Sequence, residues 1–185
     1  MPLLLITPPA SEPVSLAEAK AHLRLQISDD DATITSLIAA ARRMIEKRHG
    51  LALLPQDWAM FADAWPEDGI FQIPLWPVSA VESLISFGED DTASTIDPAH
   101  YVLDTASRPA RVALRQGRDF TPPGRRINGL KLSFTAGFDD VPAEIRQALL
   151  ITVADWYQNR GDEQGGALPV AALEALAAYR NTRLA

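Results

Sequence analysis

The sequence predicts an α+β fold, mainly α, in which a helical bundle carries an inserted antiparallel β-meander. Apolar residues recur at spacings of three and four in the first 50 residues and again after residue 141, which is typical of amphipathic helices. Between residues 51 and 135 they alternate with polar residues in short runs separated by Pro, Gly and Asp, which indicates strands and turns. We therefore expect one domain over residues 1–185, with N-terminal helices (14–50), a β-rich insertion (51–135) and C-terminal helices (141–185).

Composition narrows the class of protein. The chain has 185 residues, of which 47% are hydrophobic and 22% charged, a normal globular mixture. It has no cysteine, which excludes disulfides, thiolate metal sites and cysteine nucleophiles. The opening MPLLLITPPA has no basic residue before its short apolar run, so we expect neither a signal peptide nor a membrane span. A net charge of −7 argues against a general nucleic-acid binder.

The N-terminal third predicts an arm and two helices. Met1–Pro13 contains four prolines, and its apolar residues follow neither a helical nor a strand spacing. It is interpreted either as an extended arm on a neighbouring subunit or as a frayed terminus. Ser15 and Glu18 have the capping-box spacing and start a short helix to Leu25. A second helix follows Asp29-Asp30-Asp31 and stops at Gly50, with Ile34, Leu37, Ile38, Ala41 and Ile45 on its apolar face.

The middle of the chain predicts strands. Those expected are 57–63, 70–75, 81–87, 101–104 and 111–114. Residues 89–98 and 117–129 are polar and are expected to be loops. Leu130, Leu132 and Phe134 then alternate with polar residues as a last strand, and Gly137 ends it.

The C-terminal third predicts a long helix and a shorter one. Pro142 suits a first helical turn, and the stripe of Ile145, Ala148, Leu149, Thr152, Val153 and Trp156 runs along one face. A polar link follows at Gly161–Gly166. Pro169 then starts a closing helix with Leu173, Leu176 and Tyr179 on one side.

No residue pattern in the chain has the form of a catalytic, metal or cofactor site. His22, His49 and His100 lack a second histidine at ligand spacing. Asp29-Asp30-Asp31 complements a helix dipole better than it would enclose a cation. No glycine-rich phosphate loop or G-x-S-x-G motif occurs. We therefore expect no catalytic residue, no metal and no cofactor.

The charge is unevenly distributed. Residues 105–131 contain seven basic residues and one acidic residue, a net charge of +6, which leaves −13 on the rest of the chain. One interpretation is a surface that meets phosphate groups or an acidic partner; the other is arginines scattered over loops that face different ways. The candidate residues are Arg108, Arg111, Arg115, Arg118, Arg125 and Arg126.

A second candidate surface lies near the C-terminus. Trp156 continues an apolar stripe and is expected in the core, whereas Tyr157 and Arg160 beside it are residue types favoured at interfaces. With Leu176, Tyr179 and Arg180 they form a candidate interface with another protein or a second subunit.

The order of these packing patterns resembles a known family, the head–tail connector (adaptor) proteins of long-tailed bacteriophages and of phage-like gene transfer agents. The matching stretches, in order, are PVSLAEAKAHLRL, DDDATITSLIAAARRMIEKRHGLALLPQDW, IPLWPVSAVESLISF, Tyr101–Asp104, FTAGFDDVPAEIRQALLITVADWYQNRG and LPVAALEALAAYR. Each is a packing pattern and not a chemical site, so the resemblance depends on their common order and spacing.

The resemblance implies a structural protein and not an enzyme. It implies a ring of twelve subunits under the capsid portal, assembled in the bacterial cytoplasm, with double-stranded DNA passing through without sequence-specific binding. Its partners would be the portal protein, a tail-side connector, stopper or terminator protein, and further copies of itself. The C-terminal segment would face the portal and the inserted sheet the tail. We expect a monomer or small oligomer in isolation.

Two alternatives remain open at this point. One is a DNA-binding or packaging accessory protein that uses the arginine-rich lobe, and its affinity would fall steeply with salt. The other is a hydrolase or nuclease with an unrecognised acidic site, which would lose a metal-dependent activity when Asp29, Asp30 or Asp31 is changed.

Overall fold

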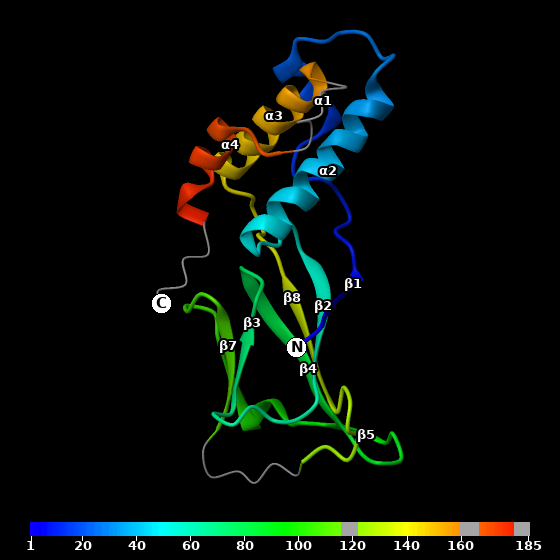
Figure 1. Cartoon of the computed structure of the whole chain (residues 1–185), viewed down its shortest axis with the longest axis vertical. Coiled ribbons are helices and arrows are strands. Elements are labelled where there is room, and N and C mark those ends of the chain that lie inside the picture. The colour runs from blue at the N-terminus through cyan, green and yellow to red at the C-terminus, as the bar shows by residue number, and fades with distance from the viewer. Residues whose placement is uncertain (116–121, 160–166, 180–185) are drawn as a thin grey trace. The chain divides into compact units, whose positions relative to one another are not determined.

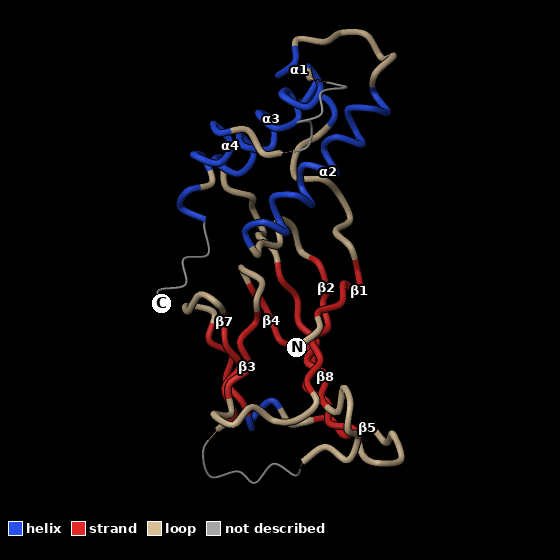
Figure 2. The backbone as a smooth tube through the Cα atoms, in the orientation of Figure 1, coloured by secondary structure: helices blue, strands red, loops and turns tan. Residues whose placement is uncertain are grey.

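The computed structural model describes residues 1–115, 122–159 and 167–179. The chain divides into two compact units. Residues 1–9 and 55–138 form the sheet unit, and residues 10–54 and 139–185 form the helical unit. Each unit is therefore built from segments far apart in the sequence. Figure 1 follows the chain from blue to red through both, and Figure 2 shows the strands in red and the helices in blue.

The larger sheet of the sheet unit has five antiparallel strands in the order β1-β2-β8-β4-β5. Their bounds are β1 Leu3–Thr7, β2 Gln56–Ala62, β8 Leu130–Ala136, β4 Val78–Phe87 and β5 Ala93–Thr95. The central strand β8 buries Leu130, Leu132 and Phe134 at alternate positions, as the period of two predicts. It pairs with β2 on one side, where Trp58 lies opposite Phe134, and with β4 on the other.

A second sheet of three antiparallel strands completes the sheet unit in the order β3-β7-β6. Its strands are β3 Ile70–Ile73, β7 Ala110–Leu114 and β6 Tyr101–Asp104, and a 3-10 turn, Pro98–His100, leads into β6. Phe71, Ile73 and Val112 are at most 1% exposed. The two sheets thus enclose apolar side chains of their own.

The described part of the helical unit contains α1 Leu16–Leu23, α2 Asp31–His49, α3 Ala143–Gln158, α4 Val170–Ala175 and a 3-10 turn, Ala177–Tyr179. The capping box that the sequence predicts is present: the Ser15 hydroxyl accepts from the Glu18 N–H at 3.2 Å, and the Glu18 carboxylate accepts from the Ser15 N–H at 2.9 Å. Gly50 ends α2 at a φ of 63°, a conformation that glycine adopts without strain.

Helix α3 is the centre of the helical unit, because it contacts α1, α2 and α4. It buries Ile145, Ala148, Leu149, Thr152 and Val153 of the predicted stripe. Trp156, which was expected in the core with them, is only half-buried, and its indole N–H donates to the Ala167 carbonyl at 2.8 Å. Helix α2 buries Ile34, Ile38, Ala41 and Ile45 on the facing side. None of the described helices is long and apolar enough to cross a membrane.

The prediction of a mainly helical bundle with an inserted meander is wrong. Of the described residues, 33% are helical and 28% are in strands, and the strands form two antiparallel sheets. The prediction gave too small a share of the fold to the strands, because it assigned the core to the helices and the strands to an insertion. They instead pair around the central strand β8 and bury a core of their own, so that sheet and helix contribute comparably.

Two strands were absent from the prediction. Residues 3–7, interpreted as an extended arm or a frayed end, form β1 and pair with β2 of the same chain, Leu4 lying opposite Ala59. The stretch 89–98, expected to be a loop, contains the short strand β5. Both are edge strands with few buried side chains, so their apolar pattern carries little signal.

Candidate interaction surfaces

The arginine cluster does not form one free basic surface in the part of the chain that the structure describes. Arg111 on β7 donates to the Asp104 carboxylate at the end of β6, with an Nη2–Oδ2 distance of 2.6 Å. The same carboxylate accepts from the Ser107 hydroxyl at 2.6 Å and from two backbone N–H groups of the turn. The Ser107 hydrogen bonds, and then Arg111, hold the pKa of Asp104 well below its ordinary value.

Two more arginines of the cluster are also engaged. The Arg125 guanidinium lies 2.7 Å from Asp91 Oδ1 and 4.4 Å above the Phe87 ring. Arg108 lies 4.6 Å above the Trp76 ring, and burial lowers its pKa. A polar cavity of about 320 Å³ adjoins it and is lined by Gln72, Ser107, Arg108, Pro109 and Arg111. The paired carboxylates of Asp104 and Asp91 offset the charge that Arg111 and Arg125 offer to an outside polyanion. Stacking leaves Arg108 charged but holds its guanidinium against the Trp76 ring.

The remaining members of the cluster are Arg115, Arg118 and Arg126. Arg115 and Arg126 are exposed and have no ion pair among the described side chains. Arg118 lies outside the described residues. Of the seven basic residues predicted over 105–131, those described without an ion pair or a ring contact are therefore the exposed Arg115 and Arg126 and the half-buried Lys131.

The second candidate surface is partly internal to the helical unit. The Tyr157 hydroxyl donates to the Asp30 carboxylate and so ties α3 to the start of α2. Leu176 is fully buried. The Tyr179 hydroxyl donates to Glu144 Oε2 at 3.4 Å, and burial, followed by the negative charge of Glu144, raises the pKa of Tyr179. Arg160 and Arg180 lie outside the described residues.

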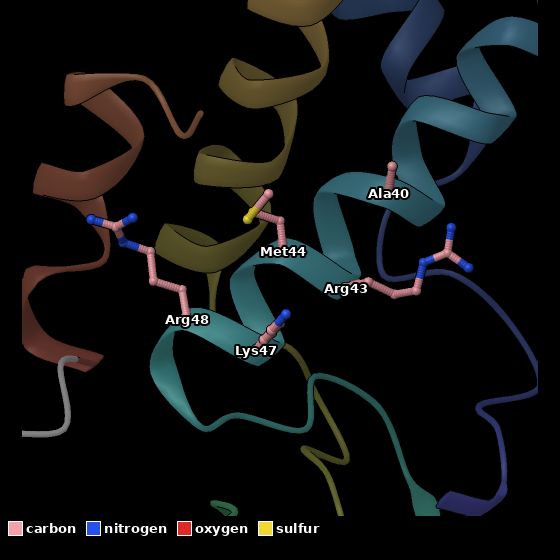
Figure 3. Close-up of a pocket in the computed structure, with 5 residues that line it drawn as sticks. All are labelled: Ala40, Arg43, Met44, Lys47 and Arg48. Carbon is pink, nitrogen blue, oxygen red and sulfur yellow. The ribbon is translucent and has the colours of Figure 1, made fainter. Parts of the chain in front are cut away.

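Helix α2 carries a groove that was not predicted from the sequence. It has a volume of about 490 Å³ and is lined by Ala40, Arg43, Met44, Lys47 and Arg48. Figure 3 shows these side chains leaving successive turns of the C-terminal half of α2, with Met44 between Arg43 and Arg48. Met44 and Ala40 are half-buried, whereas the three cations are exposed. We call this feature the α2 groove.

The sequence contains a signal for the α2 groove, but that signal also has an explanation that needs no groove. Arg43 and Lys47 are four residues apart, which places them on one helix face. Cations near a helix C-terminus are favoured by the helix dipole, which accounts for them without a binding partner. What the sequence did not indicate is that these three side chains have no ion pair among the described residues.

The histidines and acidic residues do not gather into a metal site where the chain is described. No group of three or more His, Asp or Glu side chains there has the arrangement needed to hold an ion. His22 is exposed, His49 is buried at the end of α2, and His100 is half-buried in the 3-10 turn before β6. Asp30 accepts a hydrogen bond from Tyr157, and Asp31 forms an ion pair with Lys20. Two of the three carboxylates at the start of α2 therefore have partners within the helical unit.

The chain resembles known proteins both in sequence and in structure. Residues 13–89 match the family model described as phage gp6-like head-tail connector protein. No curated protein sequence matches the chain. Three solved structures match all of it and 98% of their own chains. One is the neck of an empty GTA particle computed with C6 symmetry, at 25% identity and a TM-score of 0.85.

The other two structures are of native particles. The virion of the native gene transfer agent (GTA) particle matches at 23% identity, and the neck of the native GTA particle computed with C12 symmetry at 24%, both with a TM-score of 0.83. The resemblance to head–tail connector proteins, indicated by the order of the packing patterns, is confirmed. Because the matches cover both units together, they extend the likeness beyond residues 13–89.

Proposed function

We propose that this chain, which matches the phage gp6-like head-tail connector family over residues 13–89, is a structural adaptor in the neck of a phage-like particle, where it joins the capsid portal to the tail. The observation that carries the proposal is the likeness of the whole chain, sheet unit and helical unit together, to a chain of a GTA neck. A likeness confined to one unit would indicate only that the two proteins contain a similar domain. A likeness that includes both units supports the proposal that the two proteins occupy the same position in their particles.

The assembly we propose is a ring of twelve copies with double-stranded DNA passing through its bore. C12 symmetry, applied to the neck of the native GTA particle, supports the number. A ring of identical subunits needs head-to-tail contacts that close. We further propose that the C-terminal segment faces the portal and the sheet unit faces the tail-side protein.

In this role the protein acts by contact and not by catalysis. The described polar clusters are consistent with such a role, because Asp104, Arg111 and Ser107 fix a turn and Asp30 and Tyr157 join two helices. A substrate turned over by the purified chain would contradict this part of the proposal.

The alternative, a DNA-binding accessory protein that uses the arginine cluster, has less support. Arg111 and Arg125 are in ion pairs and Arg108 is stacked on Trp76, so few of these charges are available for phosphates. The two roles differ in salt dependence. An accessory protein would bind duplex DNA with an affinity that falls steeply as salt rises, whereas an adaptor would bind free duplex weakly at every salt concentration.

Electron cryomicroscopy of intact particles tests the adaptor role. We expect a ring of this chain between portal and tail. We also expect particles made without the chain to contain filled heads and no attached tails, with tails restored when the gene is supplied in trans. A neck of normal composition that lacks this chain would overturn the proposal.

A further inference from the structure

The helical unit has complementary surfaces near opposite ends of α2. The α2 groove has an apolar floor of Met44 and Ala40 surrounded by Arg43, Lys47 and Arg48. Before the other end of α2 lies the turn of residues 24–30, which we call the knob. Its Ile27 is 58% exposed, and its Asp29 is exposed without a hydrogen bond or ion pair among the described residues. The groove offers positive charge and an apolar floor. The Ile27–Asp29 tip of the knob offers an apolar side chain and a carboxylate, whereas the exposed Arg24 lies at its base, next to α1.

The knob is held at its base, so that Ile27 and Asp29 project from a supported turn. Arg24 ends α1 in the left-handed conformation, and its N–H donates to the Ala21 carbonyl at 3.2 Å. On the other side of the turn, Asp31 is paired with Lys20 at 2.6 Å and Asp30 accepts from Tyr157. A supported loop loses less conformational freedom when it binds, which favours docking.

Charge makes the pairing useful in an assembly of identical chains. Each copy carries a net charge of −7, so neighbouring copies repel one another. Unpaired cations on one copy and an unpaired carboxylate on the next offset part of that repulsion. The half-buried Met44 in the groove favours a protein segment over DNA as the occupant, because a phosphate backbone offers nothing apolar to cover it.

We infer that in the ring the knob of one copy occupies the α2 groove of the next, with Ile27 against Met44 and Asp29 facing Lys47 and Arg43. The inference rests on the ring proposed above. Helix α2 has 19 residues and is therefore about 28 Å long, so knob and groove are well separated on one chain. Two different surfaces that fit each other across copies give a head-to-tail contact, the kind that closes into a ring.

Engineered cysteines test the contact directly, because the chain has no cysteine of its own. One tagged chain carries Ile27→Cys and a second, differently tagged chain carries Met44→Cys, and both are produced together in cells that make particles. Under mild oxidation we expect a disulfide between the two tags in purified necks. The matched control replaces Ile27→Cys by Val170→Cys, a second exposed apolar residue of the helical unit, and should give no cross-link to Met44→Cys.

Charge reversal gives a second readout. We expect Asp29→Lys and Lys47→Glu each to lower incorporation into necks by about fivefold or more, because one ion pair per contact becomes a repulsion. The double variant should recover most of the loss. Asp139→Lys reverses an exposed carboxylate of the helical unit that lies outside the knob and the α2 groove, and should leave incorporation unchanged. Thermal unfolding of each purified variant verifies that it folds.

The outcomes separate this inference from the proposed function. Necks that contain the chain but show neither the Ile27–Met44 cross-link nor recovery in the double variant overturn the inference and leave the adaptor role standing. Lys47→Glu particles with an intact ring but altered DNA retention would assign the groove to DNA. Loss of neck incorporation with Lys47→Glu but not Asp29→Lys would assign it to another neck protein. Absence of the chain from necks overturns both proposals.

Discussion

Arg42 and Glu12 join the segment before α1 to the middle of α2 through two hydrogen bonds. Arg42 Nε lies 2.7 Å from Glu12 Oε2, and Arg42 Nη2 lies 3.2 Å from Glu12 Oε1. Arg42 also donates to Glu46 at 2.9 Å, and Glu46 in turn accepts from the Leu53 N–H at 3.0 Å. Burial opposes the charged guanidinium, but the hydrogen bonds and charges of Glu12 and Glu46 raise the pKa of Arg42.

Glu12→Gln should therefore destabilise the helical unit. Arg42 is only 9% exposed, and a buried charged donor that loses its carboxylate costs about 1–3 kcal/mol of the free energy of unfolding. Urea denaturation followed by circular dichroism measures the loss. Glu89→Gln, which changes an exposed carboxylate with no described partner, is the matched control, and equal effects of the two changes would contradict the expectation.

Ser15→Ala should lower the free energy of unfolding by about 0.5–2 kcal/mol. The change removes the hydroxyl that accepts from the Glu18 N–H at the start of α1. Glu18 also binds Arg146 of α3, so a frayed α1 weakens that contact as well. Ser11→Ala, an exposed serine before the helix, should change stability little. Chemical denaturation that finds the two alanine variants alike would exclude a stabilising capping box.

Asp104 predicts a specific dependence of stability on pH. Its folded pKa is lowered by Ser107 and Arg111, so its contribution is complete above the unfolded pKa of about 3.9 and is lost as pH falls toward the folded value. The free energy of unfolding should fall less between about pH 5 and pH 2 in Asp104→Asn than in the unchanged chain. Denaturation curves across that range measure the two slopes, and parallel slopes would contradict the prediction.

Leu176→Ala should destabilise the isolated chain by about 2–5 kcal/mol, because deleting a fully buried leucine leaves a cavity. A residue used only at an interface would instead leave the unfolding of the isolated chain unchanged. Tyr179→Phe, which removes the 3.4 Å hydrogen bond to Glu144 and leaves the ring in place, should have a smaller effect than Leu176→Ala. Thermal unfolding of the three proteins distinguishes a core role for Leu176 from a contact role.

Arg115→Glu should alter DNA retention or ejection if the arginine cluster lines the bore of the ring, since the change adds negative charge next to a polyanion. Arg115 is exposed and has no ion pair among the described residues, so its replacement should leave the fold unchanged. Arg111→Glu is a poorer probe because it also breaks the pair with Asp104. Arg115→Glu particles with full DNA delivery would count against a bore position.

The sequence by itself determined the elements whose signals are local. The Ser15–Glu18 capping box, the stop at Gly50, the stripe of α3 and the alternation of β8 each depend on residues a few positions apart, and local sterics and hydrogen bonding set them. The order of those elements also indicated the family, because the resemblance depends on the order and spacing of the packing patterns and not on individual residues.

Only the tertiary structure decided which distant residues meet. Strand edges pair through backbone groups that are the same in every residue, so nothing in Leu3–Thr7 specified β2 as its neighbour. Likewise, a run of arginines in a sequence does not indicate which side chains they contact. In the structure Arg111 and Arg125 pair with Asp104 and Asp91, and Arg108 stacks on Trp76, so that most of the basic surface indicated by composition is engaged within the chain. Leu176 and the cations of the α2 groove follow the same rule: whether a helical side chain is buried or free depends on what packs against its face.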